Sequence, residues 1–213
     1  MMVKLKTTLR RFKQNVLHDP RKVYVIVAAV VIILLIAYTT TMERDINPQA
    51  YKPLLDTIAK GESNGNYNAY YGNGGNMSLK LTDMTIAEVF AWQREYVANG
   101  SPSNAVGRYQ IIEPTLDGLV RRLNIDSSEK FDEAMQDKLA IALLERRGAK
   151  DFIQGELTDR DFAANLSQEW AALPRVNGEQ PNDSYYAGDG LNQAHIKVET
   201  ILGAISSFKT AAQ

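Results

Sequence analysis

The chain has 213 residues, of which 45% are hydrophobic, and its 24 basic and 25 acidic side chains leave a formal net charge of −1. This composition excludes extended disorder and low-complexity fibres, and the length suits one folded domain with an appendage. Cysteine is absent, which excludes a disulfide framework, a thiolate nucleophile and a cysteine-bound metal.

The charge is distributed unevenly along the chain. Residues 1–22 carry seven basic side chains and one acidic one, whereas residues 43–213 hold 17 basic and 24 acidic side chains, a balance of −7. Phosphate backbones bind to basic surfaces, so nucleic acid is not an expected partner of the larger part.

Residues 23–42 contain no charged side chain and are apolar on every helical face. A helix of this length spans about 30 Å, which is the thickness of the hydrocarbon core of a bilayer. We therefore expect a basic leader at 1–22 followed by a transmembrane signal anchor from Val23 to Met42. The basic residues precede the span, so the positive-inside rule predicts a cytoplasmic N-terminus and an exported C-terminal part.

A linker is expected at 43–52, and a mainly α-helical domain with a small β or irregular lobe at 53–213. The first helix of this domain begins at Pro53 and is expected to stop near Gly61, and the Asn-, Gly- and Tyr-rich stretch 63–81 predicts a loop with a small hairpin. Periodic apolar residues predict five further helices, at 85–98, 114–123, 131–147, 159–172 and 191–208.

Glu62 is the leading candidate for chemistry, because it follows a predicted helix and runs straight into the polar loop. The negative end of a helix dipole raises the pKa of a carboxyl group, and so does partial burial. A carboxyl group with a raised pKa keeps its proton at neutral pH and can donate it to a leaving oxygen. The alternative is a solvated acid at a helix end.

Four groups of residues together resemble a known family. They are Gly61-Glu62-Ser63-x-Gly65-x-Tyr67-Asn68-Ala69, Gly107-Arg108-Tyr109-Gln110, Arg146-Arg147-Gly148-Ala149 and Trp170-Ala171-x-Leu173-Pro174. In order and approximate spacing, from about Asn47 to Ala204, they are similar to the lambda-type phage endolysins and related lytic transglycosylases. These enzymes have the α+β lysozyme fold and cleave peptidoglycan between N-acetylmuramic acid and N-acetylglucosamine, so the resemblance implies this fold and activity.

The same resemblance implies roles for individual residues. Glu62 would be the catalytic acid and base, and Ser63, Tyr67 and Gln110 would contact the substrate. Tyr109 would line the same groove.

The long loop 174–190 is of a kind that often carries function. Within it, Tyr185 and Tyr186 resemble residues that border the saccharide cleft in some phage members of the group, and aromatic faces suit sugar rings. Their alternative role is to anchor the loop by packing. For Arg108, binding of a substrate carboxylate and a structural salt bridge both stay open, and a core position is expected for Trp170.

A second carboxylate beside Glu62 is not evident in the sequence, whereas most glycoside hydrolases use two. Asp83 is more simply the N-terminal cap of the following helix. A lone acid suits a lytic transglycosylase, in which the C6 hydroxyl of N-acetylmuramic acid closes a 1,6-anhydro ring without water. A hydrolytic muramidase of the same fold and a non-catalytic peptidoglycan-binding or structural membrane protein are the alternatives.

We expect no cofactor and no metal, because His195 has no second ligand at a suitable spacing. The expected partners are the glycan strands of peptidoglycan and the lipid bilayer, with a phage virion or an envelope-spanning assembly as further partners. The resemblance suggests a phage or mobile-element protein for local cell-wall opening, anchored in the inner membrane or a virion membrane, with its domain in the periplasm.

Overall fold

The computed structural model describes residues 20–42 and 45–213, with side chains described for 20–34 and 45–213. The chain divides into two compact units, Met1–Asp45 and Ile46–Gln213. The predicted basic leader lies mostly outside the described residues, and so does the start of the predicted linker, at 43–44.

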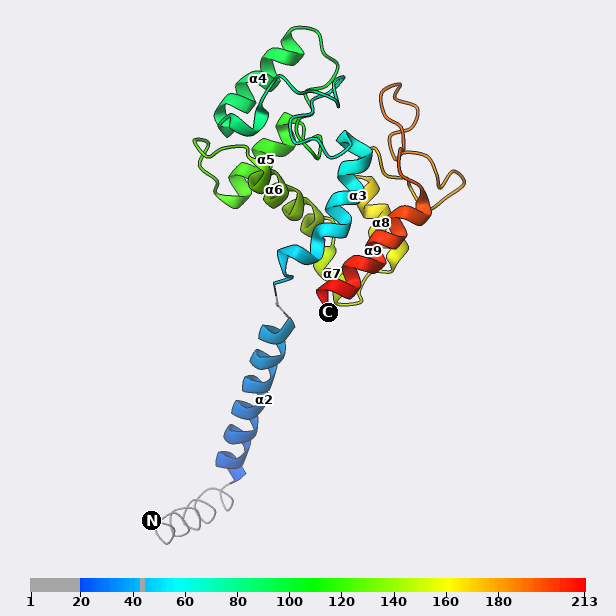
Figure 1. Ribbon diagram of the computed structural model, residues 1–213. Coiled ribbons are helices and arrows are strands. Elements are labelled where there is room, and N and C mark those ends of the chain that lie inside the picture. Colours follow the sequence, from blue (N-terminus) through cyan, green and yellow to red (C-terminus); the bar gives the residue numbers. More distant parts are fainter. Residues whose placement is uncertain (1–19, 43–44) are drawn as a thin grey trace. The chain divides into compact units, whose positions relative to one another are not determined.

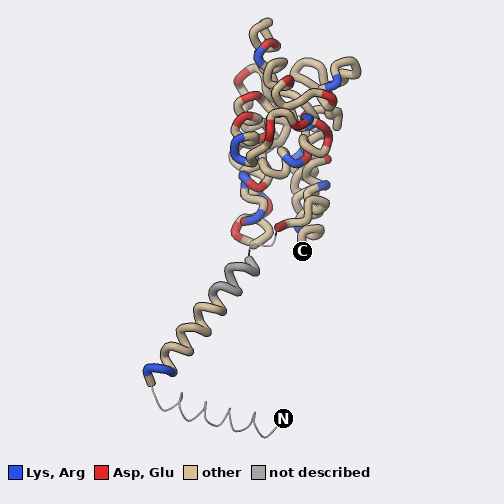
Figure 2. The backbone as a smooth tube through the Cα atoms, turned by 90° about the vertical axis from the view of Figure 1, so that its left-hand side faces the viewer, with Lys and Arg blue, Asp and Glu red and all other residues tan. Residues whose placement is uncertain are grey.

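The first unit contains the helix α2 (Pro20–Met42), which has no glycine and no proline after its first residue. Its charged side chains are Arg21 and Lys22, in its first turn (Figure 2). In the part of the chain that the structure describes, no helix has both the length and the apolar character needed to cross a membrane. Positions 35–42 of the predicted span lie outside the residues whose side chains are described, and the membrane anchor stays a prediction.

The second unit is mainly helical, as predicted, and Figure 1 shows its elements. In chain order these are η1 (Pro48–Tyr51), α3 (Lys52–Ser63), η2 (Leu81–Asp83), α4 (Ile86–Ala98), α5 (Glu113–Leu123), α6 (Glu133–Arg146), α7 (Ala149–Ile153), α8 (Asp159–Ser167) and α9 (Val198–Ala212).

Helix α3 lies between two groups of helices. It contacts α6, which leads through α5 to α4, and it also contacts α9, which packs on α8 (Figure 1). The face of α3 that carries Leu54, Leu55 and Ile58 is buried in the common core, as its spacing predicted. The C-terminal end of α3 is therefore held from both sides.

The domain begins earlier than the sequence indicated. The ring of Tyr51 is almost fully buried and stacks on Phe208 of α9, with 5.0 Å between the ring centroids, and Ala50 is also buried. Residues 46–52, which were expected to be part of a linker, therefore belong to the folded unit, because their apolar side chains complete its core.

The predicted small hairpin is replaced by a loop that asparagine side chains hold together. Among the described residues there are isolated β-bridges, including Tyr70 with Asn73, but no strand. The Asn76 side chain donates to the carbonyls of Asn68 and Leu79, at 2.6 and 2.7 Å, and Asn66 donates to the Gly74 carbonyl at 3.0 Å. Side-chain amides thus satisfy backbone groups that a ladder would otherwise pair.

Two helix boundaries near Glu62 differ from the prediction. Helix α3 continues past Gly61 to Ser63 and is capped by Asn64 in the left-handed conformation, with φ 53°. Helix α8 ends at Ser167, not at 172. A glycine therefore did not mark the helix end here, because asparagine also tolerates the left-handed cap.

Other boundaries also shifted. The N-terminal cap of α4 is Thr85, which forms a capping box with Glu88, and not Asp83. Helix α9 begins at Val198 and not at 191, and the short helix α7 was not predicted.

Candidate active site

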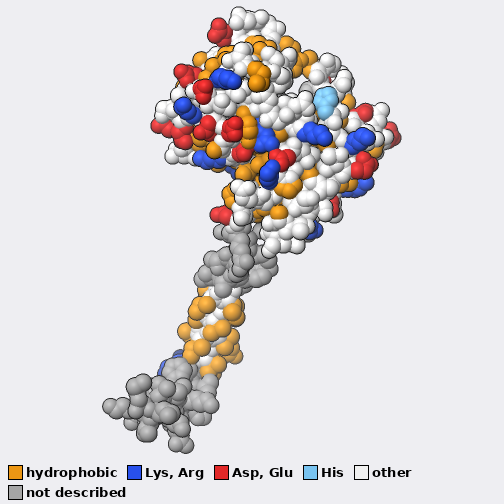
Figure 3. All heavy atoms as spheres, in the orientation of Figure 1, with side chains coloured by type: hydrophobic (Ala, Val, Ile, Leu, Met, Phe, Trp, Pro, Cys, Tyr) orange, Lys and Arg blue, Asp and Glu red, His pale blue; other side chains and the backbone are white. Residues whose placement is uncertain are grey.

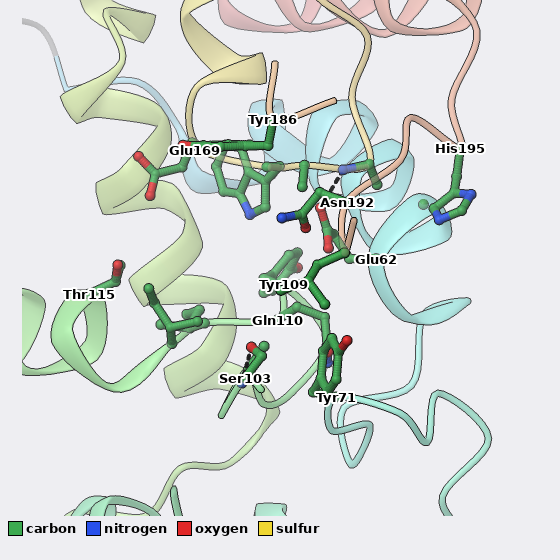
Figure 4. A pocket seen from close by; sticks show the side chains of 18 of the residues that line it. Glu62, Tyr71, Ser103, Tyr109, Gln110, Thr115, Glu169, Tyr186, Asn192 and His195 are labelled. Carbon is green, nitrogen blue, oxygen red and sulfur yellow. Dashed lines mark hydrogen bonds between the residues drawn. The ribbon is translucent and has the colours of Figure 1, made fainter. Parts of the chain in front are cut away.

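A pocket of about 670 Å³ lies beside the C-terminal end of α3 (Figure 4). Its wall comes from segments far apart in the sequence: the asparagine-rich loop, the turn before α5, the end of α6, the turn after α8 and the segment before α9. The volume lies within the usual range of ligand sites. Among its lining residues are Glu62, Tyr71, Tyr109, Gln110, Thr115, Arg146, Arg147, Glu169, Trp170, Ala172, Tyr186, Asn192 and His195.

Glu62 lies in the last turn of α3 and on the wall of this pocket. The backbone N–H of Ala172 donates a hydrogen bond of 3.0 Å to Glu62 Oε1. Burial raises the pKa of the Glu62 carboxyl group to about 7, and the hydrogen bond from Ala172 opposes this increase. The main cause is therefore desolvation, whereas the sequence had indicated the helix dipole first.

The early end of α8 explains how Ala172 reaches Glu62. Had this helix continued to 172, the N–H of Ala172 would have bonded to the carbonyl four residues earlier. The carbonyl of Ala172 is also used, because it accepts hydrogen bonds from the N–H groups of His195 and Ile196, at 2.8 and 3.0 Å. One residue thus joins α3, the turn after α8 and the segment before α9.

Gly61 permits this close packing. A Cβ atom at position 61 would lie 2.9 Å from the Cβ atom of Ala172 and 2.9 Å from Cγ1 of Ile196. Such distances do not occur between carbon atoms in contact, so the glycine is required by close approach and not by its φ angle.

Gln110 and Tyr109 line the pocket, as predicted, and both come from a tight turn. Gly107 and Gln110 have φ angles of 76° and 47°, and the Gln110 side chain donates to the Gly107 carbonyl at 2.8 Å. The buried side chain of Gln136 fills the space over Gly107 and accepts the N–H of Arg108 at 2.9 Å. Gln136 belongs to α6, so this helix holds the turn in place.

Ser63 and Tyr67, which were predicted to contact the substrate, do not line the pocket. Ser63 is buried, and its hydroxyl donates to the Arg108 carbonyl at 2.8 Å. The hydroxyl of Tyr67 donates to Asp137 Oδ1 at 3.0 Å, and burial, followed by this hydrogen bond, raises the Tyr67 pKa to about 12. These side chains therefore stabilise the structure behind the pocket wall and do not form part of the wall.

Arg108 is the centre of this bracing network and forms the structural salt bridge that was one of its two predicted roles. It donates to Asp56 Oδ1 at 2.7 Å and to the hydroxyl oxygens of Tyr67 and Tyr109 at 2.7 and 3.2 Å. The Tyr109 hydroxyl in turn donates to Asp137 at 2.6 Å. Arg108 does not belong to the pocket wall.

The two tyrosines of the long loop have different positions. Tyr186 lines the pocket, and its hydroxyl donates to the Gln168 carbonyl at 2.8 Å. Tyr185 is half exposed, does not line the pocket, and packs its ring edge to face with Tyr186 at 5.2 Å. The predicted saccharide contact therefore suits Tyr186, whereas Tyr185 supports it by packing. Trp170 is buried, as predicted, although it also touches the pocket.

Four residues of the wall received no role from the sequence, although two of them, Arg146 and Arg147, belong to the Arg-Arg-Gly-Ala motif of the resemblance. Asn192 lies next to Glu62 in Figure 4, and its amide is held by a 2.6 Å hydrogen bond to Asp189. The pair follows an Asp-x-x-Asn pattern, a local signal for such a turn.

Arg146, Arg147 and Glu169 form an ion-pair cluster on the same wall, and Glu169 is the other pocket-lining acid in the described chain. Within the described residues, no group of three or more acidic, histidine or cysteine side chains is placed to hold a metal ion.

Comparison with known proteins gives one family match. The sequence model of a family described as Endolysin matches residues 52–197, which include every residue of the pocket wall. No curated protein matches significantly. Two solved structures are similar, each at 21% identity over 79% of this chain and 96% of the other: bacteriophage lambda lysozyme complexed with a chitohexasaccharide, with a TM-score of 0.45, and lysozyme from bacteriophage lambda, with a TM-score of 0.42. The family assignment rests on the sequence model.

Proposed function

Because the chain belongs to the endolysin family and is a peptidoglycan-cleaving enzyme, we propose that it is a lytic transglycosylase with Glu62 as its catalytic residue. The bond cut is the β-1,4 bond between N-acetylmuramic acid and N-acetylglucosamine. The observation that carries the proposal is the Glu62 carboxyl group, which lies in the pocket, has a pKa of about 7 and forms no ion pair in the described chain.

In the first step, Glu62 acts as an acid. With a pKa of about 7, a large fraction of the carboxyl groups carries a proton at neutral pH. That proton passes to the glycosidic oxygen as the bond from C1 of N-acetylmuramic acid breaks, and N-acetylglucosamine leaves with a free 4-hydroxyl group. The hydrogen bond from Ala172 holds Oε1, which directs the other carboxyl oxygen, Oε2, toward the substrate.

In the second step, the ionised Glu62 acts as a base. It takes the proton of the C6 hydroxyl group while that oxygen bonds to C1, which closes the 1,6-anhydro ring and restores the protonated carboxyl group. The nucleophile is part of the substrate, so the enzyme needs no group to position a water molecule.

The other pocket carboxylate is poorly suited to hydrolysis. Glu169 accepts hydrogen bonds of 2.7 Å from Arg146 to both of its oxygens and one of 2.8 Å from Arg147. In Figure 4 it lies across the view from Glu62 and its carboxylate points away. Both oxygens of this carboxylate already accept hydrogen bonds from guanidinium groups, so it is poorly placed to orient a water molecule, which favours the transglycosylase over the muramidase.

Other groups on the wall suit a sugar chain. The side-chain amides of Asn192 and Gln110 offer hydrogen bonds to hydroxyl and N-acetyl groups, and the ring of Tyr186 offers an apolar face. We assign these three residues to substrate binding, with Tyr109 as the floor of the groove.

The test is the mass of the muropeptides that the full chain releases from purified peptidoglycan. We expect products that are lighter by one water than those of hydrolysis, with anhydro ends. The Glu62→Gln variant should lose at least about 100-fold in rate, since general acid catalysis contributes that much. Glu95→Gln, an exposed glutamate of α4 outside the pocket, is the matched control and should cleave normally.

Reducing ends in place of anhydro ends would show a water-using muramidase. If the folded wild-type chain releases nothing while it still binds the wall, a non-catalytic binding protein is the better assignment.

We also propose that residues 23–42 anchor the enzyme in the inner membrane or a virion membrane, with the domain in the periplasm. The support is the uncharged run after seven basic residues. Such a tether would limit cleavage to the wall within reach, which suits local wall opening by a phage or mobile element.

A further inference from the structure

One end of the pocket carries an excess of positive charge. We call it the arginine end and define it by Arg146, Arg147 and Glu169, all of which line the same pocket as Glu62. Arg146 ends α6 and Arg147 caps it, while Glu169 comes from the turn after α8. Two guanidinium groups face one carboxylate, so one positive charge is left without an acidic partner in the described chain.

The two arginines are not equivalent. All three guanidinium nitrogens of Arg147 already donate hydrogen bonds: Nε to Glu169, and the two Nη atoms to the side chain and the carbonyl of Gln168. Within the described residues Arg146 donates from Nη2 alone, and its side chain is 41% exposed against 27% for Arg147 and 7% for Glu169. Arg146 therefore keeps Nε and Nη1 for a ligand, and Glu169 holds its plane in place.

The rest of the domain makes this excess unusual. Residues 43–213 have a balance of −7, and Figure 3 shows acidic and basic side chains side by side over the visible face of the second unit. A guanidinium group is a planar fork of donors that matches a carboxylate. The glycan backbone of peptidoglycan offers no free carboxylate, because the lactyl group of N-acetylmuramic acid is joined by an amide bond to a stem peptide. The stem peptide does carry free carboxylates.

We propose that the arginine end binds a free carboxylate of the stem peptide, chiefly through Arg146. The inference rests on the proposed cleavage at Glu62, since both groups line one pocket and the stem peptide is carried by the sugar whose bond is cut. The site would make the enzyme prefer peptide-bearing wall to bare glycan. If the arginines serve only to end α6 and pair with Glu169, the stem peptide makes no difference.

The experiment compares two substrates with the full chain: glycan strands with their stem peptides, and bare strands, from which an amidase has removed the peptides and whose freed lactyl carboxylates have then been capped as methylamides. For wild type we expect kcat/KM about tenfold higher with the peptide, which corresponds to one charge-assisted hydrogen-bonded pair. Arg146→Ala should remove this preference by raising KM for peptide-bearing strands about tenfold more than KM for bare strands. Added salt should weaken only the peptide-dependent part.

Arg121→Ala is the matched control, because Arg121 is exposed at the end of α5, pairs with Asp117 and lies outside the pocket. It should keep the wild-type preference.

Equal loss on both substrates in Arg146→Ala, or no preference in wild type, overturns the inference and leaves a structural ion pair. A peptide preference with reducing ends as products supports the inference and overturns the transglycosylase. If wild type cleaves neither substrate, titration with a disaccharide that carries its stem peptide and with the same disaccharide whose lactyl group is capped as a methylamide decides the inference separately. About tenfold tighter binding of the peptide-bearing form, lost in Arg146→Ala, supports the inference, and equal binding overturns it.

Discussion

At the scale of single residues, the protonation of Glu62 should control the rate. Its pKa of about 7 lies above the ordinary value of 4.5, so the group stays protonated at acidic pH and ionises as the pH rises through neutrality. The first step needs the proton, and we expect kcat/KM to stay level below a pH of about 7 and to fall about tenfold per pH unit above it. Initial rates of peptidoglycan cleavage between a pH of about 5 and 9 give this profile.

The profile also distinguishes the mechanisms. A transglycosylase that uses one carboxyl group as both acid and base shows the single descending limb. A hydrolase that needs a second, ionised carboxylate adds an ascending limb at acidic pH, and a bell-shaped curve from a chain that stays folded throughout would contradict the assignment.

Gly61 has no reactive side chain, yet we expect the site to depend on it. Alanine normally stabilises a helix interior by about 1 kcal/mol relative to glycine. At position 61 its methyl group would collide with Ala172 and Ile196, so we expect Gly61→Ala to lower the free energy of unfolding by about 1–3 kcal/mol. It should also lower kcat, because the Ala172 N–H moves away from Glu62.

The control is Gly118→Ala in α5, where the new Cβ atom would meet nothing in the described chain within 4 Å apart from the neighbouring backbone of its own helix. Chemical denaturation and cleavage rates of both variants provide the measurement. If Gly61→Ala is as stable and as active as Gly118→Ala, close packing at Ala172 does not position Glu62.

How far the sequence predicts this site depends on the kind of contact. Glu62, Tyr109, Gln110 and Tyr186 were found from motifs and lie on the pocket wall. Ser63 shares a motif with Glu62, yet successive helix residues point about 100° apart, so the neighbour faces the core. Arg146 belongs to a motif of the resemblance but received no role, and Glu169 received none either, because their pairing depends on tertiary structure.

At the scale of elements, the loop 63–81 depends on side-chain amides. Asn76 is buried, donates to the carbonyls of Asn68 and Leu79, and accepts the backbone N–H groups of Ser78 and Leu79. We expect Asn76→Ala to destabilise the fold by about 3 kcal/mol, because several buried backbone groups lose their partner. Tyr70 and Tyr71 line the pocket from this loop, so glycan binding should weaken as well.

Denaturant unfolding measures this effect, with Asn182→Ala as the control, since the Asn182 side chain is exposed and makes no hydrogen bond in the described chain. Equal stability of the two variants would show that the backbone alone holds the loop. The sequence indicated a hairpin here because alternation and turn residues are also what an amide-bonded loop contains.

The helix cores were predictable, whereas their ends were not. Apolar spacing placed α3 to α6, since the period of burial follows from helix geometry. The end of α8 is set by the contacts of the residues that follow it. The Trp170 side chain is buried, and Ala172 bonds to Glu62 and to the segment before α9. Such long-range partners have no local signal.

At the scale of the whole molecule, the proposed anchor decides where the enzyme acts. Val30 and Ile33 lie in the middle of the uncharged run, and lysine at the centre of a transmembrane helix costs about 2.5–3.5 kcal/mol per residue. We expect wild type to stay in the membrane pellet after alkaline carbonate extraction. The double variant Val30→Lys, Ile33→Lys should appear in the soluble fraction with its activity on purified peptidoglycan intact, because α2 and the domain are separate compact units.

The matched control adds the same two charges to the domain, as Met77→Lys and Val97→Lys, at exposed positions outside the pocket. It should stay in the membrane pellet. The two double variants differ only in where the charge is placed, so a difference in partition isolates the role of residues 23–42. If wild type is already soluble, or if both variants partition alike, the chain is not held by this segment and its restriction to nearby wall has another cause.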